Sequence, residues 1–364
     1  MSQQFNRKLI LENGEEYCGY GFGSESDKVL DIVFNTSMVG YQEILSDPSY
    51  TYQAVVMTYP LIGNYGMADD DYETARPSIG AFIVKEYNDE PSNFRCTKTM
   101  AEVMKEYDIV GVYGVDTRKI GRSIRDLGSR KVLITGMDTS LQEGMKILAA
   151  TPIPKDAVPS VSRPAPVESP AKNGRFHVVA IDCGMKQNIV RSLNKKGCNV
   201  TIVPWNTSAA QILSYNPDGV FISNGPGDPV DVPETVETIR TLKGRLPIFG
   251  ICLGHQIISL AYGGQTYKMK FGHRGGNHPV RNLETGKLEI TSQNHSYAVV
   301  DESLKNTPLQ VTHINILDNT IEGVKCDEDR IFSVQYHPES APGPQDSAYL
   351  FDRFIKLMED EKNA

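Results

Sequence analysis

The chain has 364 residues, and this length predicts two domains rather than one. Its 40% hydrophobic and 23% charged residues are typical of a globular protein, and its net charge of -8 argues against a nucleic-acid partner, which a basic face would bind. It contains neither an apolar run long enough to span a membrane nor a signal-peptide pattern, so we expect a cytoplasmic location.

Short β-rich runs dominate residues 1–150. Asn13-Gly14 predicts the turn of a hairpin, because both residues tolerate a positive φ. The predicted hairpin covers residues 7–23, and further strands are predicted over 53–60 and 81–87. Helical spacing predicts helices over 99–109, behind a Thr99 cap, and over 117–128, ending at Gly128. We therefore expect residues 1–150 to form an α+β domain of their own.

Proline marks the boundary between two regions. Six of the chain's 21 prolines lie between Pro152 and Pro170. Such a segment is not expected to hold a helix or a central strand, and it behaves as a semi-extended spacer. We interpret residues 151–174 as an interdomain linker.

Strands and helices alternate after this linker. The predicted strands are 176–184, 198–204, 218–225 and 246–251, and the predicted helices are 186–197, 208–217 and 234–245. Apolar strands separated by amphipathic helices indicate a mostly parallel sheet that is covered on both faces. The predicted fold class of residues 175–361 is therefore α/β, a doubly wound sheet with its ligand crevice at the carboxyl ends of the strands.

The first chemical motif is GICLG, residues 250–254, which lies between the last of these strands and an apolar helix. Small residues two before and two after Cys252 permit the sharp strand-to-helix turn of a nucleophile elbow. Such a turn directs the thiol into the crevice, over a helix N-terminus that favours the thiolate. We expect Cys252 to be a nucleophile.

The second motif lies at residues 330–340, where a predicted strand ends in His337-Pro338-Glu339. A cysteine nucleophile needs a base to accept its proton, and that base needs an acceptor to orient it. Residues two apart on an extended segment point to the same side, so Glu339 is expected to orient His337.

The third motif is SNGPGDP, residues 223–229, which closes another predicted strand. Gly225 and Gly227 leave backbone N–H groups open to a ligand oxygen, as an oxyanion hole requires. Neither a GxGxxG fingerprint nor a P-loop occurs, so no nucleotide site is expected in this chain. The six cysteines show no CxxC pair and no Cys/His ligand spacing, which predicts free thiols and no metal site.

These three motifs, in this order on a doubly wound sheet, resemble those of class I (triad-type) glutamine amidotransferases. The combination of GxCxGxQ with a downstream HPE is more specific than any single motif. In that family the cysteine attacks the glutamine amide and forms a γ-glutamyl thioester, which water then hydrolyses. The resemblance implies that Cys252 is the nucleophile, His337 the acid/base and Glu339 its orienting group.

The first half of the chain narrows the resemblance. Residues 32–66 resemble the N-terminal domain of carbamoyl phosphate synthetase small subunits, and residues 269–280 and 291–299 match the same family. The chain is thus identified as a member of that family over essentially its whole length. The implied glutamine-binding residues are Ser49, Gly225, Gly227, Leu253, Gln256, Asn294, Ser296 and Tyr297. Some members have Gly and Phe at the last two positions, and contacts made by the backbone would survive that change.

The resemblance also implies a partner. In this family a large synthetase subunit receives the ammonia through a tunnel and makes carbamoyl phosphate from bicarbonate with ATP and a divalent metal. The product feeds arginine and pyrimidine synthesis. We expect a heterodimer with such a subunit, and no cofactor in this chain.

Three other functions remain as alternatives. The first is an amidotransferase for another synthetase, such as one that makes anthranilate or GMP. The second is a non-catalytic regulatory module of the same fold. The third is a general cysteine hydrolase, such as a γ-glutamyl peptidase. Residues 34–50 argue against the first, and the intact Cys252, His337 and Glu339 set argues against the second. Strong glutaminase activity of the isolated chain would favour the third.

Overall fold

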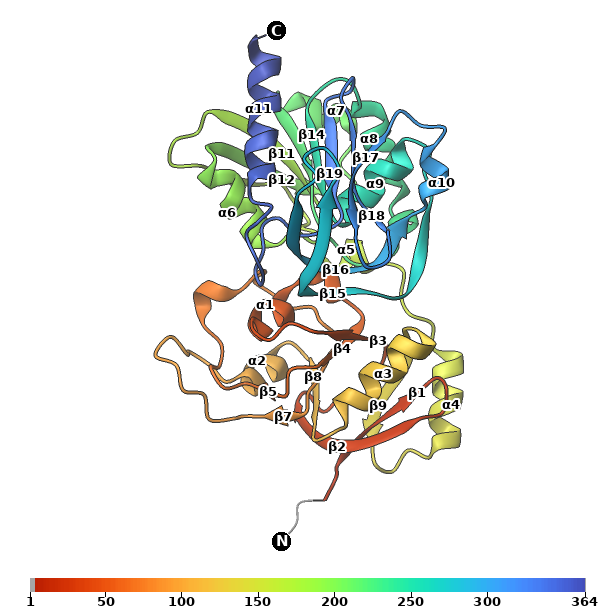
Figure 1. Ribbon diagram of the computed structural model, residues 1–364. Helices are drawn as coiled ribbons and strands as arrows, with labels where there is room; N and C mark the ends of the chain where they lie inside the picture. The colour runs from red at the N-terminus through yellow and green to blue at the C-terminus, as the bar shows by residue number, and fades with distance from the viewer. Residues whose placement is uncertain (1–3, 364) are drawn as a thin grey trace. The chain divides into compact units, whose positions relative to one another are not determined.

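The computed structural model describes residues 4–363, so the predictions for residues 1–3 and 364 lie outside the described part (Figure 1). The chain divides into two compact units, Met1–Pro154 and Lys155–Ala364. The division falls inside the predicted linker. Within residues 4–363, no helix has the length and apolar character needed to cross a bilayer.

The first unit is built around a closed barrel. Its strands follow the order β1 (Arg7–Leu11), β2 (Glu16–Gly23), β8 (Val110–Tyr113), β6 (Ala81–Ile83), β4 (Gln53–Met57), β3 (Lys28–Asn35) and β9 (Arg130–Gly136). The predicted hairpin is confirmed, because β1 and β2 pair in antiparallel register and Gly14 turns between them at φ +86°. Strands β5 (Leu61–Ile62) and β7 (Glu86–Tyr87) form a small separate sheet.

Both predicted helices of this unit are present. Helix α2 (Met100–Glu106) begins with a capping box between Thr99 and Glu102, and α3 (Thr117–Leu127) ends at Gly128, whose φ is +94°. The unit also contains elements that the pattern did not indicate: α1 (Tyr41–Ser46), α4 (Leu141–Ala150) and the 3-10 turns η1 (Pro48–Tyr50) and η2 (Asp69–Asp71).

The predicted linker is more ordered than a spacer, and the expectation that it holds no helix was wrong. Helix α5 (Ala157–Val161) forms within it, and β10 (Val167–Ser169) pairs antiparallel with another strand of the second unit. Pro159 lies in the first turn of α5, where backbone N–H groups have no partner within the helix, so its missing N–H costs little. β10 is an edge strand, as the prolines around it require.

The second unit contains a mixed sheet. Among residues 155–363 its strand order is β10, β12 (Cys198–Pro204), β11 (Phe176–Asp182), β13 (Gly219–Ile222), β14 (Ile248–Ile251), β19 (Ile331–Val334), β18 (Ile321–Cys326), β17 (Gln310–Asn315), β15 (Thr266–Asn282) and β16 (Leu288–Val299). The predicted parallel part runs from β12 to β19. Strands β18, β17, β15 and β16 extend it in antiparallel fashion.

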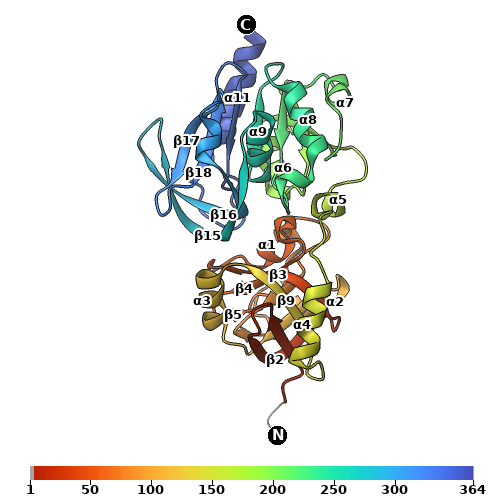
Figure 2. The ribbon, with the colours of Figure 1, turned by 90° about the vertical axis from the view of Figure 1, so that its right-hand side faces the viewer.

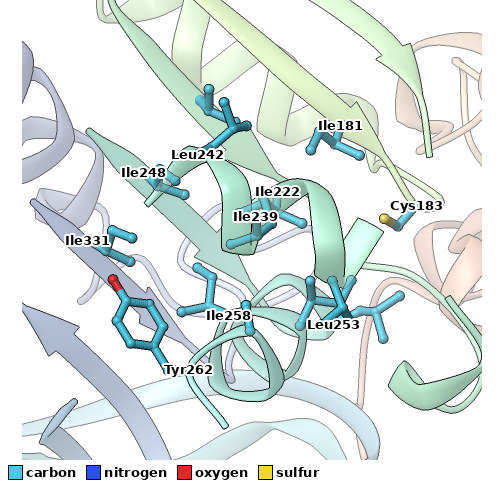
Figure 3. Close-up of a cluster of buried hydrophobic side chains, with 14 of the residues drawn as sticks. Ile181, Cys183, Ile222, Ile239, Leu242, Ile248, Leu253, Ile258, Tyr262 and Ile331 are labelled. Carbon is cyan, nitrogen blue, oxygen red and sulfur yellow. The ribbon is translucent and has the colours of Figure 1, made fainter. Parts of the chain in front are cut away.

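Helices cover both faces of the parallel part, as a doubly wound sheet requires (Figures 1 and 2). Helices α6 (Gln187–Lys195) and α11 (Tyr349–Asn363) bury their apolar residues against one face. Helices α7 (Ala209–Ser214), α8 (Pro233–Leu242) and α9 (Leu253–Ala261) bury theirs against the other. Figure 3 shows this second core, where Ile239 and Leu242 of α8 and Ile258 of α9 meet the strands. The remaining short elements are α10 (Asp301–Leu304) and η3 (Pro229–Asp231).

Candidate active site

Three parallel strands bring the predicted motifs to one edge of the sheet. β14 pairs in parallel with β13 on one side and with β19 on the other. The segments that follow these strands carry Gly225, Cys252 and His337 in turn. Because the carboxyl ends of parallel strands meet at one edge, this edge is the expected position of an active site.

Cys252 adopts a strained backbone conformation between β14 and α9. Its φ is 54° and its ψ is -104°, in a region that residues other than glycine rarely enter. The flanking glycines explain how the chain turns here: a Cβ on Gly254 would lie 2.4 Å from the carbonyl oxygen of Ile222, and a Cβ on Gly250 would lie 2.7 Å from Ile258. The local geometry is that of the predicted nucleophile elbow.

The thiol itself is buried, in contrast to the open crevice that we expected. Cys252 is only 2% exposed, and its Sγ lies 3.5 Å from the backbone oxygen of Asn294. Asn294 belongs to β16, one of the antiparallel strands that extend the sheet. This segment covers the elbow, and the sequence pattern of the parallel part contained no sign of it.

His337 stands between the thiol and Glu339. Its Nδ1 lies 2.7 Å from Oε1 of Glu339, and its side chain also interacts with Cys252. Burial alone lowers the pKa of His337, but the Glu339 carboxylate, its hydrogen bond to Nδ1 and the neighbouring Cys252 side chain outweigh it, so the pKa is raised. The imidazole is therefore held in the protonated form at neutral pH. Within residues 4–363, His337 Nε2 itself has no hydrogen-bond partner.

Lys186 completes this arrangement, and none of the three sequence motifs predicted it. Its Nζ lies 2.9 Å from Oε1 of Glu339 and donates to the backbone oxygen of Ser340 at 2.6 Å. Burial raises the pKa of Glu339, but the charges of Lys186 and His337 lower it further than burial raises it. Lys186 immediately precedes α6, in the loop after β11. That position at another strand end was the one signal in the sequence that pointed to it.

The glycines of residues 223–229 lie close to the elbow. A Cβ on Gly225 would lie 2.1 Å from the carbonyl oxygen of Cys183 and 2.9 Å from the Leu253 side chain, so only glycine fits. Gly227 has φ +87°. The Gly254 N–H donates to the carbonyl oxygen of Ser223 at 3.1 Å, which joins this loop to the first turn of α9. The backbone N–H of Leu253 lies at the start of that turn, where N–H groups have no acceptor within the helix.

Polar contacts within the protein hold several of the residues that were predicted to bind glutamine. Gln256 is buried and donates from Nε2 to the Tyr297 carbonyl oxygen at 2.8 Å and to Gln335 Oε1 at 3.0 Å. Ser296 Oγ accepts a hydrogen bond from Arg274. Ser49 lies in the first unit, buried in η1, where its backbone N–H donates to Asp47. Contact with glutamine stays a prediction for all of these residues.

Each of the two units matches the sequence model of a known protein family. The second unit matches the family described as "Glutamine amidotransferase class-I" over residues 179–357. The first matches "Carbamoyl-phosphate synthase small chain, CPSase domain" over residues 9–134. The fold and these matches define a class I glutamine amidotransferase domain that follows a separate β-rich domain.

Relatives that match over almost the whole length of the chain identify a more specific family. The carbamoyl phosphate synthase small chain of Staphylococcus epidermidis is 52% identical over 356 residues, which cover 98% of this chain and 97% of the relative. That of Fusobacterium nucleatum is 50% identical, covering 98% and 99%. The pyrimidine-specific small chain of Halalkalibacterium halodurans is 52% identical, covering 98% of each. The chain belongs to the family of carbamoyl phosphate synthase small chains.

Proposed function

We propose that this chain hydrolyses the side-chain amide of L-glutamine and delivers the ammonia to a large synthetase subunit that makes carbamoyl phosphate. The observation that carries the proposal is the buried contact series from Lys186 through Glu339 and His337 to Cys252. A thiol beside an imidazole that a carboxylate orients is the arrangement that nucleophilic catalysis by cysteine requires.

The first chemical step forms a thioester. The Cys252 thiolate attacks the amide carbon, and the electron pair of the carbonyl moves to its oxygen. Backbone N–H groups of Leu253 and Gly227 stabilise that oxyanion, and one such donor is worth roughly 3 to 4 kcal/mol. The His337 imidazolium gives its proton to the amide nitrogen as the C–N bond breaks, so that ammonia leaves and a γ-glutamyl thioester remains.

The second step returns the enzyme to its starting state. Neutral His337 takes a proton from water, which attacks the thioester carbon, and the C–S bond breaks to give glutamate and the Cys252 thiolate. Glu339 accepts the Nδ1 hydrogen of His337 throughout, which fixes the orientation of the ring. Lys186 keeps Glu339 ionised while it does so. We propose that the predicted glutamine-binding residues of the second unit hold the substrate: Gly225, Gly227, Leu253, Gln256, Asn294, Ser296 and Tyr297.

A partner subunit follows from the chemistry of the product. Ammonia is mostly protonated at neutral pH, and ammonium is not a nucleophile, so direct transfer to a second site preserves its reactivity. Membership of the family of small chains supports a large partner subunit. We propose that the two form a heterodimer and that the large subunit uses bicarbonate, ATP and a divalent metal. The name of one relative supports a role of the product in pyrimidine synthesis. We propose that the product also serves arginine synthesis.

The test separates the two half-reactions in the complex copurified with its large subunit. Cys252→Ser should abolish carbamoyl phosphate synthesis from glutamine and leave synthesis from added ammonium chloride intact. Cys18→Ser, at a half-buried cysteine of the first unit, is the matched control and should leave both intact. Retained glutamine-dependent synthesis in Cys252→Ser would refute the role of the thiol, and loss of both activities would refute the division of labour.

A further inference from the structure

In addition to the Cys252, His337 and Glu339 set, three buried side chains of the second unit converge from three antiparallel strands. His273 lies on β15 and His295 directly opposite on β16, while Glu322 lies on β18. One ligand-type atom from each lies within 4.8 Å of the others. His273 Nδ1 and Glu322 Oε1 are 3.5 Å apart. Their exposed fractions are 7%, 5% and 0%, so this cluster is inside the protein.

The second nitrogen of each histidine is already bound to an acceptor. His273 Nε2 lies 2.9 Å from Oδ2 of Asp318, and His295 Nδ1 lies 2.8 Å from the carbonyl oxygen of Tyr297. A carbonyl oxygen only accepts, so the hydrogen of a neutral His295 is on Nδ1. Its Nε2 lies 3.1 Å from Oε1 of Gln293, and an ion bound to Nε2 would take the place of that contact. Histidines that bind metals show this arrangement, in which a carboxylate or a backbone carbonyl fixes the tautomer from behind.

Glu322 contributes an oxygen that the described residues leave unsatisfied. Its Oε1 has contacts to His273 and to Asn315, whereas Oε2 is buried and has no hydrogen-bond partner within residues 4–363. A buried carboxylate oxygen without a partner destabilises the fold, because it has lost its water. A bound cation would remove that destabilisation.

We propose that His273, His295 and Glu322 form a binding site for one divalent transition-metal ion of the zinc class. Two imidazoles and one carboxylate are a ligand set that zinc accepts, at bond lengths of about 2.0 to 2.2 Å. Ligand atoms around such an ion lie about 3.3 Å apart, close to the separation of His273 Nδ1 and Glu322 Oε1. The charges balance, because Glu322 and Asp318 offset the two positive charges of the ion.

The sequence pattern did not reveal this set because the ligands are spread over residues 273–322 and meet only through strand pairing. A bound ion would link β15, β16 and β18 beside two segments, one that contains Asn294 and one that leads to His337. Asn294, whose carbonyl oxygen faces the Cys252 thiol, is adjacent to His295. The Glu322 carbonyl oxygen accepts from the Gln335 N–H, two residues before His337. The ion would thus brace the segments around the elbow.

The alternative is an ion-pair cluster without metal, in which a protonated His273 bridges Asp318 and Glu322. Metal analysis distinguishes the two. All proteins for this test carry Cys252→Ser, so that the candidate nucleophile does not bind zinc itself. Each protein is stripped with a chelator, dialysed against Zn²⁺ or Co²⁺, and assayed for bound metal per chain. We expect about one tightly bound ion per chain in the parent.

Glu322→Gln keeps the shape of the side chain and removes the charged ligand, so it should lower metal binding at least tenfold. Glu237→Gln, on the exposed side of α8, is the matched control and should bind as the parent does. Cobalt should give visible d–d bands without a thiolate charge-transfer band, since no sulfur is in the set. A parent that binds no metal, or a Glu322→Gln protein that binds equally well, would overturn the proposal. If Glu322→Gln fails to fold, anomalous diffraction from zinc-soaked parent crystals decides, and an absent peak between His273 and Glu322 refutes the site.

Discussion

Lys186 and His337 contact the same oxygen of Glu339. Lys186 Nζ lies 2.9 Å from Oε1, and His337 Nδ1 lies 2.7 Å from it. All three side chains are almost completely buried, so their charges interact with little screening by solvent. The carboxylate is stabilised from two sides, and the imidazole it orients is directed at Cys252.

Removing the lysine charge should destabilise the fold and abolish glutaminase activity. Lys186→Met leaves a buried Glu339 whose remaining charged partner is His337, and breaking a buried pair in this way costs about 3 to 5 kcal/mol. Lys196→Met, which breaks the partly exposed pair with Asp352, is the control and should cost about 0 to 1 kcal/mol. Urea unfolding followed by circular dichroism measures the unfolding free energy of both variants. Equal losses of unfolding free energy would contradict a structural role for the buried pair.

Glu339→Gln should shift the pH dependence of glutamine hydrolysis. The carboxylate raises the pKa of His337, so its removal lets burial lower that pKa again. As the pH rises, the imidazolium that protonates the departing ammonia then deprotonates at a lower pH than it does in the parent. We expect kcat/KM to fall and the basic limb of its pH profile to move at least one unit toward acid. An unmoved limb with reduced kcat would mean that Glu339 acts only on geometry.

The strained backbone at position 252 predicts an unusual order of stability. In most strand or helix positions glycine is about 0.5 to 1 kcal/mol less stable than alanine. At φ 54° and ψ -104° the order should reverse, because only glycine enters this region without strain of about 1 to 3 kcal/mol. Cys252→Gly should therefore unfold at higher urea than Cys252→Ala. Cys326→Gly and Cys326→Ala, on β18, provide the control. At this position the glycine variant should be the less stable of the two.

Buried neutral histidines should make the second unit sensitive to mild acid. Burial lowers the pKa of His255 to about 3, below its ordinary value of about 6.5. The unfolded chain binds a proton below pH 6.5 and the folded chain does not, so the stability contribution is complete above that pH. It is lost as pH falls toward 3, by about 2 kcal/mol at pH 5.

His255→Asn tests this effect through a difference of slopes. Between pH 7 and pH 5 the parent should lose about 2 kcal/mol more unfolding free energy than the variant does. His313→Asn should behave in the same direction, because burial lowers the pKa of His313 to about 4. Parallel pH profiles for parent and variants would show that these rings become protonated without unfolding.

The sequence alone determined the parallel part of the fold and the residue types of the candidate site. Alternating strands and helices of periods near 2 and 3.6 are local features, and so are the glycines on either side of Cys252 and the two-residue spacing of His337 and Glu339. Each of these depends on a few neighbouring positions. For that reason the hairpin at Gly14 and the helices ending before Gly128 and beginning after Thr99 could be predicted.

Only the tertiary structure decided which distant residues meet. Lys186 and Glu339 are separated by 153 positions, and no local period relates them. The cover that β16 places over the Cys252 thiol and the convergence of His273, His295 and Glu322 depend on the register of strands far apart in the chain. Pairing registers and the burial they impose are collective results of packing, and so the electrostatics of this site appear only when the chain has folded.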